Sequence, residues 1–490
     1  MARQSPEHLR VALLVYRGNP HSGGQGVYTR YLSRELVELG HEVTVFAGQP
    51  WPDLDRGVGW VPVPSLDLYR EPDPFRVPQP QEFRSWIDVL EFGLMCTAGF
   101  PEPLTFSLRV RRELAGRRGD FDLIHDNQCF GRGLLGLMAD GWPLAATLHH
   151  PITVDRSLDL SHAATLGRRL TLRRWYGFLR MQMAVAARVP RIITVSESSK
   201  RDIVAQMGIR ASQLAVVPVG VDHTRFRPLP SVARVPGRIM TTASADVPMK
   251  GLVPLLEALA KVRTERNADL VVIGKPRAES RVEETIERLG LGGAVTFVSG
   301  VTDERIVELY AEASVAVVPS LYEGFSLPAI EAMACGVPLV TTTGGALPEV
   351  VGRDGETGLL VPPGDPGALA AALGRVLEGG SLAARLSAAG RERVLEHFTW
   401  RACAEATVEH YRWVLDNSAS FQAGAAGGAS GASGAGSRAR SGAGGEAGGR
   451  VGGVGGGAGE VGEAGGRVGG VGGGAGEAGG RVGGVGSQAC

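Results

Sequence analysis

Residues 315–340 read VAVVPSLYEGFSLPAIEAMACGVPLV and change within a few positions from a strand pattern to a helix pattern. The apolar run 315–318, closed by Pro319, predicts a short strand that is buried in a parallel sheet. Residues 327–335 are rich in Ala, Leu, Met and Glu and precede a Gly-Val-Pro segment, which predicts the following helix. A strand that leads through a short loop into a helix is the repeating unit of an α/β fold.

Two carboxylates lie eight positions apart across this change. Glu323 falls in the loop before the backbone amides of Gly324, Phe325 and Ser326, and Glu331 lies about two helical turns further on. Carboxylates accept hydrogen bonds from hydroxyls, whereas the amides and the dipole at a helix N-terminus attract anions. A ligand with many hydroxyls and a phosphate, such as a sugar nucleotide, would use both. The alternative is a chance pair of glutamates on a helix.

The composition suits a protein of two α/β domains with additional segments. The chain has 490 residues, is 43% hydrophobic and has a formal net charge of zero, which argues against a general nucleic-acid binder. Its apolar runs are too short for a transmembrane segment or a secretory signal. Five cysteines without metal-ligand spacing are typical of free thiols in a reducing cytoplasm.

The alternation of strands and helices predicts two doubly wound parallel sheets. In the first unit, residues 1–215, the expected strands are 11–16, 42–46, 121–125, 143–147 and 191–195. In the second unit, residues 216–398, the expected strands are 238–243, 270–273, 294–298, 315–318 and 338–341. Residues 50–106, rich in Pro and aromatic residues, are interpreted as an irregular insertion. A helix is predicted at 399–417, and the Gly-rich repeats of 418–490 predict a disordered tail.

Further candidates lie where predicted strands end. Gly23, Gly24 and Gly26 form a turn between a strand and a helix, where the backbone can approach a pyrophosphate closely, although any tight turn could use glycines. His149 and His150 follow the strand 143–147, and His125 ends another strand at the same edge. Lys250 precedes a helix, where a cation is unfavourable for the dipole unless an anionic ligand compensates.

Nine sequence motifs together resemble those of the retaining, GT-B-fold glycosyltransferases of family 4, the group 1 glycosyltransferases. The resemblance covers roughly residues 10–415 and rests on E-G-F-S-L-P-A-I-E at 323–331, A-C-G-V-P-L-V at 334–340, G-G-Q-G at 23–26, T-L-H-H at 147–150, V-S-E-S-S at 195–199, V-P-V-G-V-D-H-T-R-F at 217–226, K-G at 250–251, T-G-G-A-L-P-E-V-V at 343–351 and G-E-T-G-L-L-V-P-P-G-D at 355–365. It implies a GT-B fold with two Rossmann-like domains facing across a cleft. The first is expected on the acceptor side, the second binds the nucleotide sugar, and the helix 399–417 returns to the first.

The resemblance also implies roles for single residues. His149 would lie beside the transferred sugar, with His150 as a second candidate. Glu323 would bind the hydroxyls of the donor sugar and Glu331 the ribose. Lys250 would bind the leaving diphosphate, and the glycine loop would meet the donor phosphates. His125 is a candidate for the acceptor side, with a structural role as the alternative, and the insertion 50–106 is a candidate acceptor surface.

The chain departs from the family pattern at Ser244, where the family usually has an arginine six residues before the lysine. A hydroxyl cannot replace a bidentate guanidinium clamp on phosphate. Either another cation substitutes, with Lys275 as the main candidate and Arg17 as a further one, or the protein binds donors weakly.

The implied reaction moves a hexose from a nucleoside-diphosphate sugar to a hydroxyl acceptor. No D-x-D pair appears where a metal would bridge the diphosphate, so neither a metal site nor another cofactor is expected. The alternatives are a GT-B-fold phosphorylase, a nucleotide-sugar epimerase, or a catalytically weak sugar-nucleotide-binding protein. A cytoplasmic location is expected. The Arg-rich segment 166–191 is interpreted either as a peripheral contact with the inner membrane face or as a core helix whose arginines reach solvent.

Overall fold

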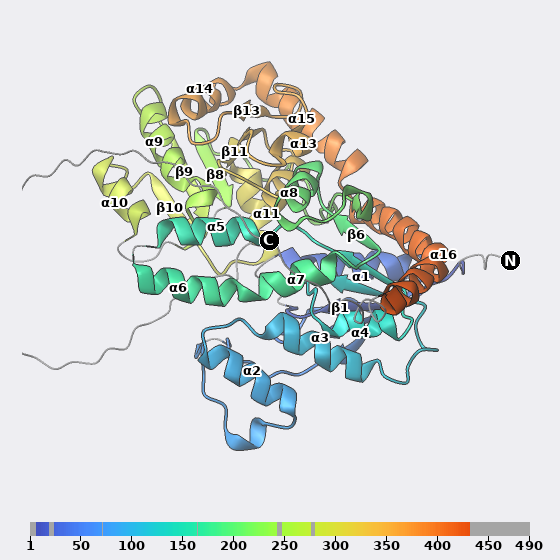
Figure 1. Cartoon of the computed structure of the whole chain (residues 1–490). Coiled ribbons are helices and arrows are strands. Elements are labelled where there is room, and N and C mark those ends of the chain that lie inside the picture. The colour runs from blue at the N-terminus through green and yellow to red at the C-terminus, as the bar shows by residue number, and fades with distance from the viewer. Residues whose placement is uncertain are drawn as a thin grey trace, which may run out of the picture. The chain divides into compact units, whose positions relative to one another are not determined.

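The computed structural model describes residues 6–18, 24–70, 72–163, 165–242, 247–275 and 280–431. The first sheet, of which Figure 1 labels β1 and β6, has seven parallel strands in the order β3-β2-β1-β4-β5-β6-β7. These strands are β1 (Arg10–Val15), β2 (Glu42–Ala47), β3 (Gly59–Pro62), β4 (Leu123–Asn127), β5 (Leu144–Thr147), β6 (Arg191–Thr194) and β7 (Leu214–Val216). The associated helices are α1 (Gly24–Glu38), α2 (Trp86–Cys96), α3 (Glu102–Glu113), α4 (Gly133–Ala139), α5 (Thr153–His162), α6 (Leu166–Trp175), α7 (Leu179–Ala186) and α8 (Glu197–Met207).

Both faces of the first sheet are buried, as an α/β fold requires. Along β1, Val11 and Leu13 belong to a core cluster that includes Leu32 of α1. Ala12 and Leu14, which point the other way, belong to a second cluster with helices α3 and α4. Because successive side chains of a strand face opposite sides, helices must cover both faces, and this explains the continuous apolar run in β1.

The second sheet has six parallel strands in the order β10-β9-β8-β11-β12-β13 (Figure 1). They are β8 (Arg238–Thr242), β9 (Asp269–Ile273), β10 (Val295–Val298), β11 (Val315–Val318), β12 (Leu339–Thr342) and β13 (Leu359–Val361). The helices here are α9 (Leu252–Arg263), α10 (Arg281–Arg288), α11 (Asp303–Glu312), α12 (Leu327–Ala334), α13 (Leu347–Val351), α14 (Pro366–Leu377) and α15 (Gly380–His397). None of the helices within the described ranges is long and apolar enough to cross a membrane.

The prediction of two doubly wound parallel sheets is confirmed, but strands β3, β7 and β13 were not predicted. Each is an edge strand of only three or four residues, and so short a run gives little pattern. The prediction that 50–106 is irregular is wrong in part, because it contains β3, helix α2 and the start of α3. The capping box of Ser85 and Asp88 at the start of α2 was a readable signal.

Helix α16 (Trp400–Gly431) contacts α1 and β4 of the first sheet. Trp400 stacks on Tyr31 of α1 with ring centroids 5.3 Å apart, and the Tyr411 hydroxyl lies 2.5 Å from His125 Nδ1. The backbone helix continues past residue 417, where the disordered tail was expected to begin. Alanines are frequent there, and a docked helix supplies the nucleus for further turns. Residues 432–490 of the predicted tail lie outside the described residues.

Candidate functional site

Glu323 and Lys250, predicted separately from the sequence, form an ion pair. Lys250 Nζ lies 2.9 and 3.2 Å from the two carboxylate oxygens of Glu323, and the Ser320 hydroxyl donates to Glu323 Oε1 at 2.6 Å. Lys250 follows β8 and Glu323 follows β11, which are neighbours in the second sheet. Because both strands are parallel, their following loops emerge at the same edge, and the two side chains meet there.

Two glycines let the backbone pack closely around this pair. Gly251 has φ +67°, and a Cβ atom there would lie 2.0 Å from the Pro319 carbonyl oxygen. Gly345 has φ +64°, and its Cβ would lie 2.2 Å from the Glu323 carbonyl oxygen, which accepts a hydrogen bond from Ala346 N at 2.9 Å. A side chain fits at neither position, so the glycines of the K-G and T-G-G motifs fix the Glu323 loop.

The loop after Glu323 lies against the start of helix α8, beside the first sheet. The Gly324 carbonyl accepts hydrogen bonds from the Ser196 and Ser199 hydroxyls, at 2.7 and 3.0 Å. A Cβ atom on Gly324 would lie 3.2 Å from His150 Cβ and 3.7 Å from the His149 carbonyl oxygen. Loops that were predicted in separate domains therefore meet at Gly324.

Phe325 and Ser326 complete this loop before α12 begins. Phe325 is buried and packs edge-on against Phe398, with ring centroids 5.6 Å apart. Ser326 has φ +108°, and its buried hydroxyl has no hydrogen-bond partner among the described residues. A non-glycine residue in this region costs of the order of 1–3 kcal/mol, and such residues cluster at binding sites.

A second hydrogen-bonded contact between the two sheets' loops involves Glu349 of α13, which was not among the residues predicted from the sequence. Its carboxylate accepts hydrogen bonds from the backbone amides of Glu197 and Ser198, each at 2.7 Å. It therefore caps the N-terminus of α8, where the helix dipole favours a negative charge. The V-S-E-S-S and T-G-G-A-L-P-E motifs contain both partners, but sequence separation hides that they pair.

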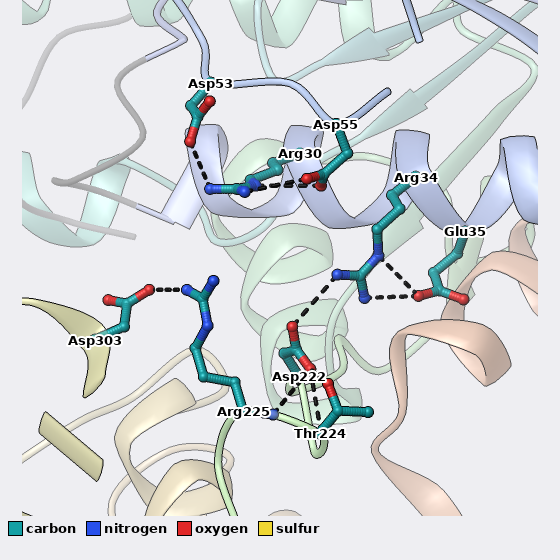
Figure 2. A network of polar contacts seen from close by, with 9 residues as sticks. All are labelled: Arg30, Arg34, Glu35, Asp53, Asp55, Asp222, Thr224, Arg225 and Asp303. Carbon is teal, nitrogen blue, oxygen red and sulfur yellow. Dashed lines mark hydrogen bonds and ion pairs between the residues drawn. The ribbon is translucent and has the colours of Figure 1, made fainter. Parts of the chain in front are cut away.

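A network of charges surrounds the connection between the sheets (Figure 2). Arg34 of α1 lies 3.3 Å from Asp222, which also accepts from the Thr224 hydroxyl at 2.6 Å. Arg225 pairs with Asp303 at the start of α11. Asp222 is buried, whereas Arg225 and Asp303 are partly exposed, so the Arg225–Asp303 pair stabilises by only about 0.2–1 kcal/mol. The network joins α1, the connecting segment and α11.

His149 lies at the carboxyl end of β5 and is held in one tautomer. Asn127 Nδ2 donates to the Gln25 carbonyl and the Thr29 hydroxyl, so its Oδ1 faces His149 Nε2, 2.8 Å away. Because an amide oxygen only accepts, Nε2 carries the hydrogen and Nδ1 is left as an acceptor. Burial lowers the pKa of His149 to about 3. The imidazole is therefore neutral at pH 7.

His125 is fully buried and both of its ring nitrogens have partners inside the fold. Nδ1 lies 2.5 Å from the Tyr411 hydroxyl, and Nε2 lies 2.7 Å from the Thr147 hydroxyl. Burial lowers its pKa to about 3. This geometry favours the structural alternative, and the acceptor-side role stays a prediction.

We expect the stability lost in His125→Gln to become smaller as the pH falls from 7 to 5. The folded pKa is about 3 and the ordinary value 6.5, so below pH 6.5 the unfolded wild type binds a proton that the folded protein excludes. Between pH 7 and pH 5 the free energy of unfolding of the wild type therefore falls by about 2 kcal/mol more than that of the variant. Urea unfolding at both pH values measures this difference. Burial raises the pKa of Asp126 and of Glu331, so these two groups stabilise the fold as the pH falls, opposite to the effect of His125. Only the difference between wild type and variant is therefore diagnostic. A constant difference would contradict the buried neutral form.

The other residues predicted for the site have few contacts or none among the described residues. Glu331 lies on α12, where the Tyr310 hydroxyl is 3.5 Å from its Oε2, and burial raises its pKa to about 7. Lys275 follows β9, is exposed and has no contact partner among the described residues. His150 Nε2 lies 2.9 Å from Asp155 Oδ2. Gly24 begins α1 and Gly26 is buried in its first turn.

Two predicted residues, Gly23 and Ser244, lie outside the described residues. Arg17, the further candidate for the missing cation, is paired bidentately with Glu102. It is therefore already neutralised by a carboxylate. No group of three or more His, Cys, Asp or Glu that could hold a metal ion occurs in the part of the chain that the structure describes.

Comparison with known proteins agrees with this fold. Residues 231–393 match the family described as glycosyl transferases group 1, and residues 22–225 match glycosyltransferase family 4. The chain is 52% identical over 404 residues to an MMP α-(1→4)-mannosyltransferase from Mycolicibacterium hassiacum, covering 82% of this chain and 98% of the relative. It is 30% identical to D-inositol 3-phosphate glycosyltransferase 2 from Catenulispora acidiphila, covering 82% and 94%. A solved structure, sucrose-phosphate synthase from Thermosynechococcus elongatus, superposes with a TM-score of 0.64 at 25% identity, covering 83% of this chain and 99% of the other.

The two doubly wound parallel sheets, together with these matches, define a glycosyltransferase of the GT-B fold. The chain belongs to the group 1 glycosyltransferases of family 4.

Proposed function

We propose that the protein transfers a mannosyl group from a nucleoside-diphosphate mannose to a hydroxyl of a glycan acceptor, with retention of configuration. The relative that is 52% identical over nearly its whole length carries the name of an α-(1→4)-mannosyltransferase, which supports mannose and an α-linkage. The observation that carries the proposal is the approach of the His149–His150 backbone to Gly324, beside the Lys250–Glu323 pair. In this proposal a neutral imidazole, a carboxylate and a cation line one binding site.

In the proposed reaction, the bond between the anomeric carbon and the diphosphate oxygen breaks, and a bond from that carbon to the acceptor oxygen forms. The acceptor proton leaves with the diphosphate. Negative charge therefore grows on the leaving group, and Lys250 is the cation that stabilises it. No metal or other cofactor is part of this proposal.

The buried side chains would hold the sugar and the ribose. His149 Nδ1 can accept a hydrogen bond from a sugar hydroxyl, because Asn127 fixes the hydrogen on Nε2. Glu323 would exchange its bond to Lys250 for hydroxyls of the donor sugar, leaving the ammonium free for the diphosphate. Glu331 would accept hydrogen bonds from the ribose hydroxyls. The backbone amides of Gly324, Phe325 and Ser326 belong to the loop between Glu323 and α12.

Calorimetric titration with GDP-mannose, UDP-glucose and the corresponding nucleoside diphosphates tests the donor. We expect tight binding of one mannosyl nucleotide. Single-turnover assays then separate a transferase, which needs an acceptor hydroxyl, from a phosphorylase, which needs phosphate, and from an epimerase, which needs neither. Binding without any cleavage would identify a catalytically weak sugar-nucleotide-binding protein. Failure of every nucleotide to bind would refute the proposal.

We also propose that the Arg-rich segment 166–191 contacts an anionic membrane surface during transfer. What supports this is helix α6, on which Leu166 and Leu170 are 72% and 56% exposed among several arginines. Apolar side chains beside basic ones are typical of helices that lie on anionic lipid.

We expect the protein to float with vesicles of phosphatidylglycerol but not with those of phosphatidylcholine, and the double variant Leu166→Glu, Leu170→Glu to remain in solution. Val89→Glu, on α2, is the control, because Val89 is 60% exposed but lies on another helix. Equal flotation of wild type and double variant would show that α6 is not the contact.

A further inference from the structure

Five aromatic side chains form a partly exposed cluster on the first sheet's side of the molecule. The aromatic cluster consists of Tyr69, Phe75, Phe100, Trp175 and Phe178. Trp175 is central, with ring centroids 5.2 Å from Phe100 and 5.7 Å from Tyr69. None of the five is among the buried core residues or the most exposed apolar ones. The rings meet tilted or edge-on, with interplanar angles from 37° to 89°, and they keep part of their surface free. Together they offer an apolar platform.

Beside these rings lies a charged pair that can both donate and accept hydrogen bonds. Arg17 Nε and Nη2 lie 2.5 and 2.9 Å from the carboxylate oxygens of Glu102, and the guanidinium lies 5.6 Å from the ring centroids of Tyr69 and Phe100. The Tyr69 hydroxyl is buried and has no hydrogen-bond partner among the described residues. The platform therefore has an apolar surface and a few fixed polar groups, the usual make-up of a small-molecule site.

The platform lies at the same sheet edge as His149. Arg17 follows β1 by two residues and His149 follows β5 by two, and only β4 separates these strands. Neighbouring strands are about 4.8 Å apart, so the two positions emerge roughly 10 Å apart. A short oligosaccharide can cover this distance.

Two features hold the platform in place. Arg109 of α3 lies 2.6 Å from Asp88 and 2.5 Å from Glu91 of α2, a buried ionic group that fixes the two helices on either side of Phe100. Of the six non-glycine residues with positive φ in the described ranges, Asp67, Phe75 and Ala98 lie in the cluster or within two residues of one of its rings. Such conformations persist only where the surroundings enforce them, and they gather at functional sites.

We propose that the aromatic cluster, together with Arg17 and Glu102, binds the saccharide units of the acceptor that adjoin the hydroxyl being glycosylated. Sugar rings stack their C–H faces on aromatic rings, and the Arg–Glu pair exchanges hydrogen bonds with neighbouring hydroxyls. The inference rests on the proposed transferase function and assigns its acceptor class as an oligosaccharide.

The test uses α-(1→4)-linked mannose oligosaccharides, from the disaccharide to the tetrasaccharide, as acceptors for the full-length protein. We expect Trp175→Ala to raise the KM for the tetrasaccharide at least about tenfold, equivalent to about 1.4 kcal/mol, with a smaller effect on the disaccharide. The affinity for the nucleoside diphosphate, measured by calorimetry, should not change. Trp175→Phe should restore most of the acceptor affinity, because it retains a ring.

Trp86→Ala is the matched control, since Trp86 is 56% exposed on α2 and contacts Arg112 instead of the cluster. Should Trp175→Ala not fold, Tyr69→Phe, which removes only the hydroxyl, should raise the acceptor KM by roughly three- to tenfold. Unchanged acceptor KM values in folded variants would overturn the assignment. So would a wild type that ignores the oligosaccharides and uses only dodecyl α-mannoside, which would assign the platform to lipid. A wild type that binds no mannosyl nucleotide would instead refute the donor proposal.

Discussion

Replacing Lys250 by alanine should lower kcat/KM for the nucleotide-sugar donor by roughly a hundredfold or more, the effect typical of losing a group that stabilises developing charge. Lys250 is the cation that contacts Glu323 at the carboxyl edge of the second sheet. Its proposed role is to meet the diphosphate as the anomeric bond breaks. The diphosphate should therefore lose affinity in the variant, whereas the nucleoside without phosphates should keep it. Steady-state kinetics and calorimetry measure the two effects.

Lys261→Ala is the matched control, because Lys261 lies at the far end of α9 and is exposed. Its kinetics should equal those of the wild type. The charge of Glu323 is unpaired in Lys250→Ala, so the melting temperature of that variant must be measured as well. A folded Lys250→Ala enzyme with wild-type kinetics would show that Lys250 does not stabilise the leaving diphosphate.

The second large effect is expected at Lys275, which we propose as the substitute for the arginine that this chain lacks at Ser244. Lys275 follows β9, the neighbour of β8, and its exposed side chain has no partner among the described residues. Lys275→Ala should weaken diphosphate binding by roughly 1.5–3 kcal/mol, or about ten- to more than hundredfold. Nucleoside binding should change much less.

Restoring the family residue with Ser244→Arg should partly rescue the Lys275→Ala variant. Calorimetry on both single variants and the double variant forms a cycle that isolates this substitution. If Lys275→Ala binds the diphosphate as tightly as the wild type, Lys250 alone meets the phosphates.

The fold was predictable because most strands repeat one pattern: a short β-branched apolar run that ends in a loop before a helix. Residues 315–340 already contain this unit, and β11 and α12 lie where that pattern indicates. Strand β3 was not predicted, because Gly59–Pro62 is a four-residue edge strand within a Pro-rich segment. Its pairing with β2 comes from tertiary structure rather than from local pattern.

The site was predictable in its residues but not in its pairings. Motifs indicated Glu323 and Lys250 one at a time, and only the strand order shows that they touch. The cap that Glu349 places on α8 joins residues about 150 positions apart, a separation across which local spacing gives no information. Trp175 lies within the Arg-rich segment 166–191, and only the structure places it against Tyr69 and Phe100.

The most direct test of the central claim is the anomeric configuration of the product. The protein is incubated with the mannosyl nucleotide that binds most tightly and with α-(1→4)-linked mannotetraose, and the new linkage is assigned by NMR from the coupling between C1 and its hydrogen. We predict one added mannose in α-linkage, formed together with one nucleoside diphosphate per transfer. A β-linked product, or consumption of the donor without any transfer to a hydroxyl, would contradict a retaining mannosyltransferase.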